Sequence, residues 1–234
     1  TSIVMSTAYM GGSSQEGFDF MSTRFPETYD VPVMRDMMDF YVKMFDYANP
    51  DSIGGDYALA ANHFTNEEAA MMLNGPWMME TLRDTNYSNE GLEERVGYAS
   101  FPNDTVVFSF NQVGFVLSAD ATDAQIEAAV EYMKTLSTSE HLVKYFEMTR
   151  GYSPSITLDE EIYDGLMPPM QDYADMFEKD LTVVPNYQTQ WNSIIINEVF
   201  TTDLPALVQG SMSIDEYIAA MDNAVEQFNE QNEE

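Results

Sequence analysis

The chain has 234 residues, of which 40 are acidic and 9 are basic, and its formal net charge is −31. Hydrophobic residues make up 44 % of it and aromatic residues 13 %, which argues against disorder. So acidic a chain repels phosphate backbones and anionic lipid surfaces, which excludes both as main partners. The charge favours a neutral or cationic solute. As an alternative, the acids only keep an exported protein soluble.

The chain contains no cysteine, which excludes disulfides and thiolate metal sites. It has no apolar run of about 18 residues, so we expect no membrane-spanning helix. The residues after Thr1 lack a charged and apolar leader, so no signal peptide is expected within this chain. Neither a GxSxG elbow nor a GxxxxGK[ST] loop occurs. We therefore predict no catalytic residue, no metal site and no cofactor, and expect the protein not to be an enzyme.

The first part of the chain is predicted to be mainly helical. A helix is expected from Asp30 to about Ala48, because Pro32 marks its start and Asn49-Pro50 follow its end. Its apolar side chains form one broad face. They are Val33, Met37, Phe40, Tyr41, Met44 and Phe45. The preceding Gly11-Gly12 pair indicates a loop, and a short helix is expected over residues 57–64.

Residues 64–77 read FTNEEAAMMLNGPW. The apolar run over 69–73 predicts a buried strand. Asn74-Gly75-Pro76 then ends the strand and begins a helix to Asp84, because proline is favoured at the first helical position. Trp77 would lie in the first turn, beside backbone N–H groups without partners inside the helix. A flat aromatic face beside free donors suits a sugar ring, whereas the alternative is a core tryptophan at a strand–helix corner.

Strands are also predicted over residues 95–101 and 106–118, with Met71, Met72 and Phe115 expected in the core. Asn111 and Gln112 interrupt the second strand with two amides. Further on, helices are expected over 122–136, 139–151, 170–179, 190–209 and 213–229, and an extended piece over 183–185. Ser213 and Glu216 form a predicted capping box. Strands separated by helices favour an α/β architecture.

The stretch over 64–77 resembles the F-x-x-G-x-x-A-M-x-x-x-G-x-W motif of the extracellular solute-binding proteins of carbohydrate ABC importers, the maltose-binding-protein-like family 1. The likeness continues in order along the chain. The matching pieces are Val96-Gly97-Tyr98, Phe101-Pro102, residues 114–118, residues 128–137, residues 151–154, Trp191 and residues 204–228. Three positions depart from the family: Asn66 stands in place of a glycine, Glu67 or Glu68 in place of a common lysine, and Ile195 in place of an arginine.

The resemblance implies a type II periplasmic-binding-protein-like α/β fold, of which this chain supplies mostly the C-terminal lobe. Residues 1–111 and 165–234 are expected to form that lobe. Residues 112–164 are expected to belong to the N-terminal lobe, most of which is absent, since family members run well beyond 234 residues. We expect this segment to be poorly supported unless another chain covers its apolar face.

The resemblance also implies a function. The protein would bind a sugar or oligosaccharide between two lobes and present it to the membrane permease of an ABC importer, itself acting as a monomer. It would be extracytoplasmic, in the periplasm or as a lipoprotein outside the cell membrane, with its signal peptide and lipid-anchoring cysteine upstream of this chain. Two alternatives stay open: a carbohydrate-active hydrolase that uses paired carboxylates, and the same fold binding a cationic solute.

The candidate ligand-binding residues begin with the two tryptophans, Trp77 and Trp191. Both match cleft tryptophans that stack on sugar faces in the family, so we expect both indoles to face one solvent-filled groove. Nearby polar side chains are candidate partners for sugar hydroxyls. These are Asn74, Glu80, Asn111, Gln112, Tyr187 and Gln190, with Tyr9 at the cleft edge. Ile195 removes one polar contact that the family has.

Overall fold

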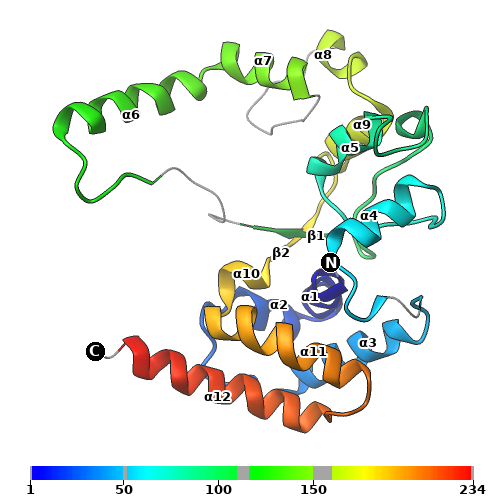
Figure 1. Ribbon diagram of the computed structural model, residues 1–234, viewed down its shortest axis with the longest axis vertical. Coiled ribbons are helices and arrows are strands. Elements are labelled where there is room, and N and C mark those ends of the chain that lie inside the picture. The colour runs from blue at the N-terminus through cyan, green and yellow to red at the C-terminus, as the bar shows by residue number, and fades with distance from the viewer. Residues whose placement is uncertain (1, 50–51, 110–115, 150–159, 233–234) are drawn as a thin grey trace. The chain divides into compact units, whose positions relative to one another are not determined.

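A computed structural model describes residues 2–49, 52–109, 116–149 and 160–232. The chain divides into two compact units (Figure 1). Unit 1 consists of Thr1–Ala60, Ser100–Gln112 and Asp180–Glu234, and unit 2 of Ala61–Ala99 and Val113–Lys179. The division into an N-terminal and a C-terminal lobe, with boundaries near residues 111 and 165, stays a prediction. None of the helices within the described ranges is long and apolar enough to cross a membrane.

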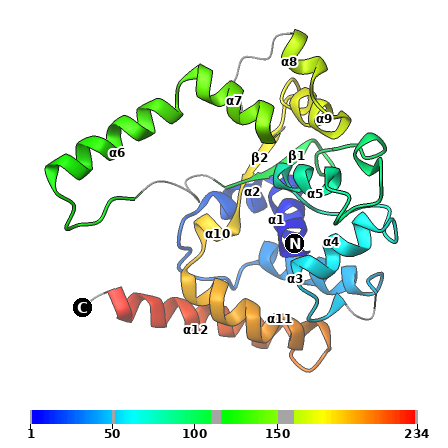
Figure 2. The same cartoon turned by 45° about the horizontal axis from the view of Figure 1, so that its top comes forward.

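Unit 1 is built mainly from helices at the two ends of the chain. They are α1 (Ser2–Ser13), α2 (Gln15–Ser22), α3 (Pro32–Phe45), α10 (Tyr187–Gln190), the π-helical segment η4 (Ile195–Val199), α11 (Phe200–Val208) and α12 (Ile214–Asn232). Segments from the two ends of the chain meet here, because α3 contacts α11 and α12 (Figures 1 and 2). Helix α4 (Tyr57–Thr65) crosses the boundary between the units.

The sheet of unit 1 has two parallel strands, β1 (Thr105–Phe108) and β2 (Thr182–Pro185). Thr105 pairs with Thr182, and the register continues to the ends of both strands. Helix α1 packs closely on this sheet, because a Cβ at Gly11 would lie 2.5 Å from Val184 Cγ1. Both Gly11 and Gly12 lie within α1, so the prediction of a loop at this pair was wrong. Because glycine has no side chain, the helix and the strand can approach each other closely at Gly11.

The core of unit 1 is rich in methionine. Met34, Met37 and Met38 of α3 are fully buried and pack with residues of α11 and α12. Each such side chain contributes about 1.5–3 kcal/mol on burial. The helix that the sequence predicts here is confirmed, but its most buried face is centred on these methionines. Val33, Met44 and Phe45 pack at the edge of the core and are only partly buried. Phe40 is also partly buried and stacks on Tyr9.

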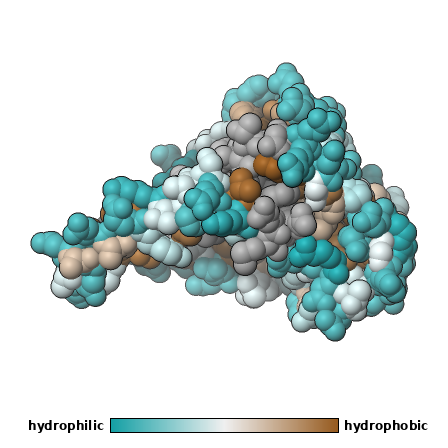
Figure 3. Space-filling view, turned by 90° about the horizontal axis from the view of Figure 1, so that it is seen from above, coloured by the Kyte–Doolittle hydropathy of each residue, from teal (hydrophilic) through white to brown (hydrophobic). Residues whose placement is uncertain are grey.

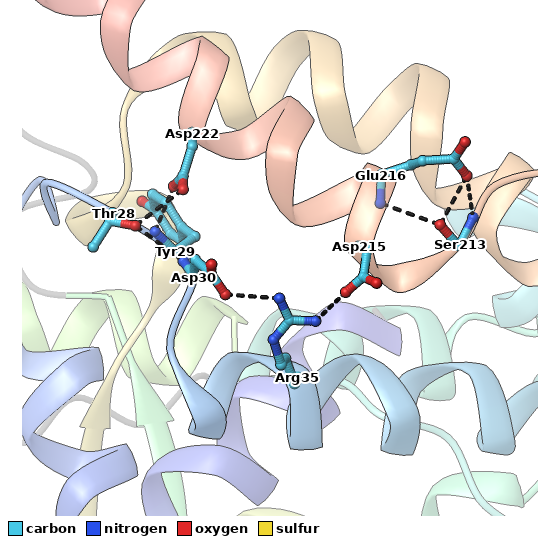
Figure 4. A network of polar contacts seen from close by, with 8 residues as sticks. All are labelled: Thr28, Tyr29, Asp30, Arg35, Ser213, Asp215, Glu216 and Asp222. Carbon is cyan, nitrogen blue, oxygen red and sulfur yellow. Dashed lines mark hydrogen bonds and ion pairs between the residues drawn. The ribbon is translucent and has the colours of Figure 1, made fainter.

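A network of polar contacts joins the start of α3 to α12 (Figure 4). Asp222 accepts hydrogen bonds from the backbone N–H of Tyr29 at 2.6 Å and from Thr28 Oγ1 at 3.0 Å. Arg35 pairs with Asp30 at 2.7 Å and also with Asp215. The segment that leads into α3 is therefore held to α12 by its backbone as well as by charged side chains.

The start of α12 is set by the predicted capping box, which is confirmed. Glu216 Oε2 accepts from the Ser213 backbone N–H at 2.8 Å, and Ser213 Oγ accepts from the Glu216 backbone N–H at 3.2 Å (Figure 4). A second capping box, Thr122 with Gln125, begins α6. In both cases two orphan N–H groups of a first turn gain partners from residues three apart.

Unit 2 contains short helices and two longer ones. They are η2 (Pro76–Met78), α5 (Met79–Arg83), η3 (Leu92–Glu94), α6 (Asp123–Leu136), α7 (Ser139–Thr149), α8 (Glu160–Asp164) and α9 (Pro168–Met176). Its buried side chains come mostly from η2, α5 and α9. They include Met78, Met79, Leu82, Leu92, Leu166, Met170 and Tyr173.

Helix α6 is different, because none of its residues is buried. Ile126, for example, is 39 % exposed. Brown and tan residues lie among teal ones along this helix, at the left of the space-filling view (Figure 3). An apolar stripe that stays in water supplies little of the packing that usually stabilises a helix.

Several predicted strands are not present. Residues 69–73 form no strand, and the strand predicted over 95–101 is reduced to an isolated bridge of Phe101 with Thr105. The strand predicted over 106–118 is, in the described part, limited to β1. Met71 is 87 % exposed and Met72 only partly buried, so placing both in the core was wrong, whereas Phe115 lies outside the described residues. A strand needs a neighbour for its backbone N–H and C=O groups. Within the described ranges, β1 and β2 form the one sheet, and Phe101 and Thr105 add only an isolated bridge.

Candidate ligand-binding site

The turn before Trp77 is fixed by its backbone hydrogen bonds. Asn74 Oδ1 accepts from the Gly75 N–H at 2.9 Å, and the Gly75 carbonyl accepts from the Met78 N–H at 3.1 Å. Pro76 occupies the first position of η2, where its missing N–H costs nothing. The helix start predicted at this proline is thus confirmed, as one turn of 3₁₀-helix followed by α5.

The same turn places Trp77 in solvent. Its side chain is 70 % exposed, while the next two residues, Met78 and Met79, are each only 3 % exposed. Two buried methionines therefore anchor the turn, and the indole lies on its outer side. The alternative of a core tryptophan at this corner is wrong. An exposed indole offers a large flat apolar face to a ligand.

Tyr98 supports this turn from within unit 2. Its hydroxyl donates to the Asn74 carbonyl at 3.5 Å, and its backbone N–H donates to Asp172 Oδ2 at 2.9 Å. Its ring meets the Tyr173 ring edge to face, with centroids 5.2 Å apart. Burial, with a smaller contribution from Tyr173, raises the pKa of Tyr98 to about 12. The phenol therefore keeps its proton to a more alkaline pH than an exposed tyrosine.

Trp191 lies in the core of unit 1 and is 2 % exposed. Its ring contacts those of Tyr29, Tyr187 and Phe200, with centroids 5.2, 5.8 and 5.8 Å away. The prediction that both indoles face a solvent-filled groove is therefore wrong for Trp191. The indole has no free face on which a sugar ring can stack.

The local backbone explains this burial. Trp191 ends α10, and its N–H donates to the Tyr187 carbonyl at 2.8 Å. Asn192 Oδ1 then accepts from the N–H groups of Ile194 and Ile195, at 3.1 and 3.0 Å, and begins the next helical stretch. Ile195, the residue in place of the family arginine, is fully buried. An apolar residue suits this core position.

The remaining candidates are distributed over both units. Glu80 is exposed on α5, a few residues after Asn74 and Trp77 in unit 2. Unit 1 holds Tyr187, which is 8 % exposed, and Gln190, whose Nε2 donates to Thr189 Oγ1 at 3.2 Å. Unit 1 also holds Tyr9, 41 % exposed and stacked on Phe40 at 4.2 Å. Asn111 and Gln112 lie outside the described residues.

One segment of unit 2 thus brings together three of the candidates, Asn74, Trp77 and Glu80. Sequence reasoning missed Tyr98 and Asp172, which stabilise the neighbouring backbone. Their contacts join residues 24 and 74 positions apart, which no local pattern reveals. Among the described residues, no group of three or more His, Cys, Asp or Glu side chains is arranged to hold a metal ion.

Comparison with known proteins identifies the family. The family model described as "Bacterial extracellular solute-binding protein" matches residues 27–178. A structure described as "Chitin oligosaccharide binding protein" is similar with a TM-score of 0.74 and 21 % identity, covering 98 % of this chain and 57 % of that one. No curated protein sequence matches the chain.

A second similar structure is a Streptococcus pneumoniae solute-binding protein in complex with the blood group A-trisaccharide. It has a TM-score of 0.73 and 14 % identity, and the match covers 97 % of this chain and 57 % of that one. These likenesses establish the predicted fold class, a partial α/β fold of the periplasmic-binding-protein type. The present chain spans little more than half the length of the two structures that it matches.

Proposed function

We propose, because the chain belongs to the family of bacterial extracellular solute-binding proteins, that it is part of a protein that binds a neutral sugar or oligosaccharide. The observation that carries this proposal is the exposed indole of Trp77 on a well-anchored turn of unit 2. The ligands in the descriptions of the two similar structures, a chitin oligosaccharide and a trisaccharide, support a carbohydrate as the class of solute.

The chemistry of the turn suits a sugar ring. The C–H groups of a pyranose pack on an indole face, and the hydroxyls need polar neighbours. Asn74 and Glu80 flank Trp77 in sequence and provide an amide and a carboxylate. In this role the protein binds and releases its ligand, and no covalent bond is made or broken.

The wider role follows from the family. The full protein would consist of two lobes that close on the sugar by a hinge motion and present it to the permease of an ABC importer. In this proposal, residues 1–111 and 165–234 belong to one lobe and residues 112–164 to the other. The exposed apolar stripe of α6 supports this division, since further residues of that lobe would cover it. The site of action is outside the cytoplasmic membrane, where the family functions.

One alternative has an observation in its favour. A net charge of −31 would attract a cationic solute such as a polyamine and strengthen its binding at low salt. A cation could also pack on the face of Trp77. A sugar, in contrast, carries no charge, so its affinity should change little with ionic strength.

Titration calorimetry on the full-length protein separates these functions. We expect heat of binding with at least one neutral oligosaccharide of a panel, with an affinity that is the same at low and high salt. Heat only with polyamines, lost at high salt, would replace the sugar by a cationic solute. The release of new reducing ends from a bound oligosaccharide would instead support a hydrolase that uses paired carboxylates.

A further inference from the structure

We propose that Gly75 is a positioning residue for Trp77: because Gly75 has no side chain, the indole can pack directly against the backbone of the turn. As far as the ligand is concerned, this rests on the proposed function. The position of the ring itself depends only on the geometry of unit 2. Gly75 would thereby control the affinity for a stacked ligand without touching the ligand.

The geometry is tight. A Cβ added to Gly75 would lie 2.2 Å from Trp77 Cζ3, 2.3 Å from Cη2 and 2.7 Å from Cε3. These three atoms form one edge of the six-membered ring of the indole, so this edge packs directly against the glycine backbone. At 70 % exposure, most of the remaining indole surface is open to solvent. The ring is therefore supported on one side and accessible on the rest.

The glycine beneath the ring is itself held in place. Its N–H donates to Asn74 Oδ1 at 2.9 Å, and its carbonyl accepts from the Met78 N–H at 3.1 Å. Met78 is buried, which ties this bond to the core of unit 2. A ring seated on such a backbone loses little additional freedom when a ligand stacks on it, which lowers the entropic cost of binding.

An alanine at this position isolates the effect. Gly75 has φ −123° and ψ −177°, extended backbone that any residue adopts. The three nearest atoms that a new methyl group would meet belong to the far end of one exposed side chain. We therefore expect the Gly75→Ala protein to fold normally, with the indole displaced from the backbone of residue 75.

NMR of the indole groups tests the positioning directly, because the chain has two tryptophans and hence two indole N–H signals. Trp77→Phe assigns them. In Gly75→Ala we expect the Trp77 signal to shift and its ¹⁵N–¹H heteronuclear NOE to fall, while the Trp191 signal and the urea midpoint stay as in the wild type. A Trp77 signal with unchanged position and dynamics would overturn the proposal.

Gly97→Ala is the matched control. A Cβ at Gly97 would approach no aromatic ring but only Asp172 Oδ2, at 3.1 Å. This oxygen accepts from the Tyr98 N–H, so the variant also shows whether a disturbance of that support reaches the indole. It adds the same methyl group within the same unit. We expect the Trp77 signal to keep its position and dynamics in this variant. Equal changes in both variants would mean that Gly75 has no special relation to the ring, and would also overturn the proposal.

A double-mutant cycle on the full-length protein tests the consequence for binding. With the oligosaccharide that binds the wild type, Gly75→Ala should weaken affinity about fivefold, the size of an aromatic contact. In the Trp77→Ala background it should have no further effect, because the two residues act as one unit. Equal losses in both backgrounds would contradict positioning. If the wild type binds no sugar at all, the proposed function fails. The NMR experiment still tests whether Gly75 positions the Trp77 ring.

Discussion

Asp222 holds the segment before α3 to α12 through two hydrogen bonds. We predict that Asp222→Ala lowers the free energy of unfolding by about 1–3 kcal/mol, because the partly buried backbone N–H of Tyr29 loses its acceptor. Urea unfolding of the chain, followed by circular dichroism, measures this loss.

Asp215→Ala provides the control for that variant. Asp215 also carries a contact of α12 to the α3 segment, through Arg35, but its side chain is 80 % exposed. Surface ion pairs contribute at most about 1 kcal/mol. A loss with Asp215→Ala as large as that with Asp222→Ala would mean that charge, and not the backbone hydrogen bond, joins the two elements.

Tyr98 makes a prediction about alkaline pH. Its pKa is raised from 10.0 to about 12 in the folded protein, so the unfolded chain releases this proton first. This phenol therefore leaves stability independent of pH below about pH 10, and stability is lost as the pH rises from 10 toward 12. In Tyr98→Phe the decrease in urea midpoint between about pH 8 and pH 11 should be smaller than in the wild type. An equal decrease in both proteins would show that Tyr98 does not contribute.

The two tryptophans illustrate what single residues reveal in sequence. The Asn-Gly-Pro turn before Trp77 has a local signature, so the helix start at Pro76 could be predicted, whereas the exposure of the ring was expected only from the family resemblance. Trp191 was predicted to face a groove because of its place in a family motif. Its burial depends on Tyr29 and Phe200, and the first of these lies far away in the sequence. Burial of this kind depends on tertiary packing, which a local pattern does not contain.

Helices and strands differ in the same way at the scale of elements. Capping boxes at Thr122 and Ser213 link residues three apart, so both helix starts were correctly predicted. A strand has no such local closure, because its hydrogen bonds go to another strand. Residues 69–73 have an apolar composition but no neighbouring strand within the described ranges, and they remain irregular.

Helices α6 and α12 should differ strongly in stability. Helix α12 buries Tyr217, Ile218 and Met221 along its 19 residues, whereas α6 buries none of its 14. Isolated helices of this length are marginal in water. In this chain alone, hydrogen exchange should be fast for α6 amides and slow for those of α12. In the full-length protein, α6 should gain protection; equal and slow exchange of both helices in the present chain would contradict this.

Charge acts at the scale of the whole molecule. A formal charge of −31 on 234 residues causes repulsion that disfavours the compact state. Salt screens this repulsion, and at about 0.5 M NaCl the screening length is only a few ångströms. The melting temperature should therefore rise from low salt to about 0.5 M NaCl. Sucrose at equal osmolality is the uncharged control. A melting temperature that does not change with salt would show that the acidic groups are too far apart to interact.

Binding affinity of the full-length protein for an oligosaccharide, measured by calorimetry for two tryptophan variants, tests the central claim most directly. Trp77→Ala should weaken binding at least about tenfold, which corresponds to about 1.4 kcal/mol, and leave the unfolding midpoint unchanged. Trp191→Phe keeps an aromatic ring in the core and should leave the affinity of the folded protein nearly unchanged. Unaltered affinity in Trp77→Ala, with a large loss in folded Trp191→Phe, would contradict the account.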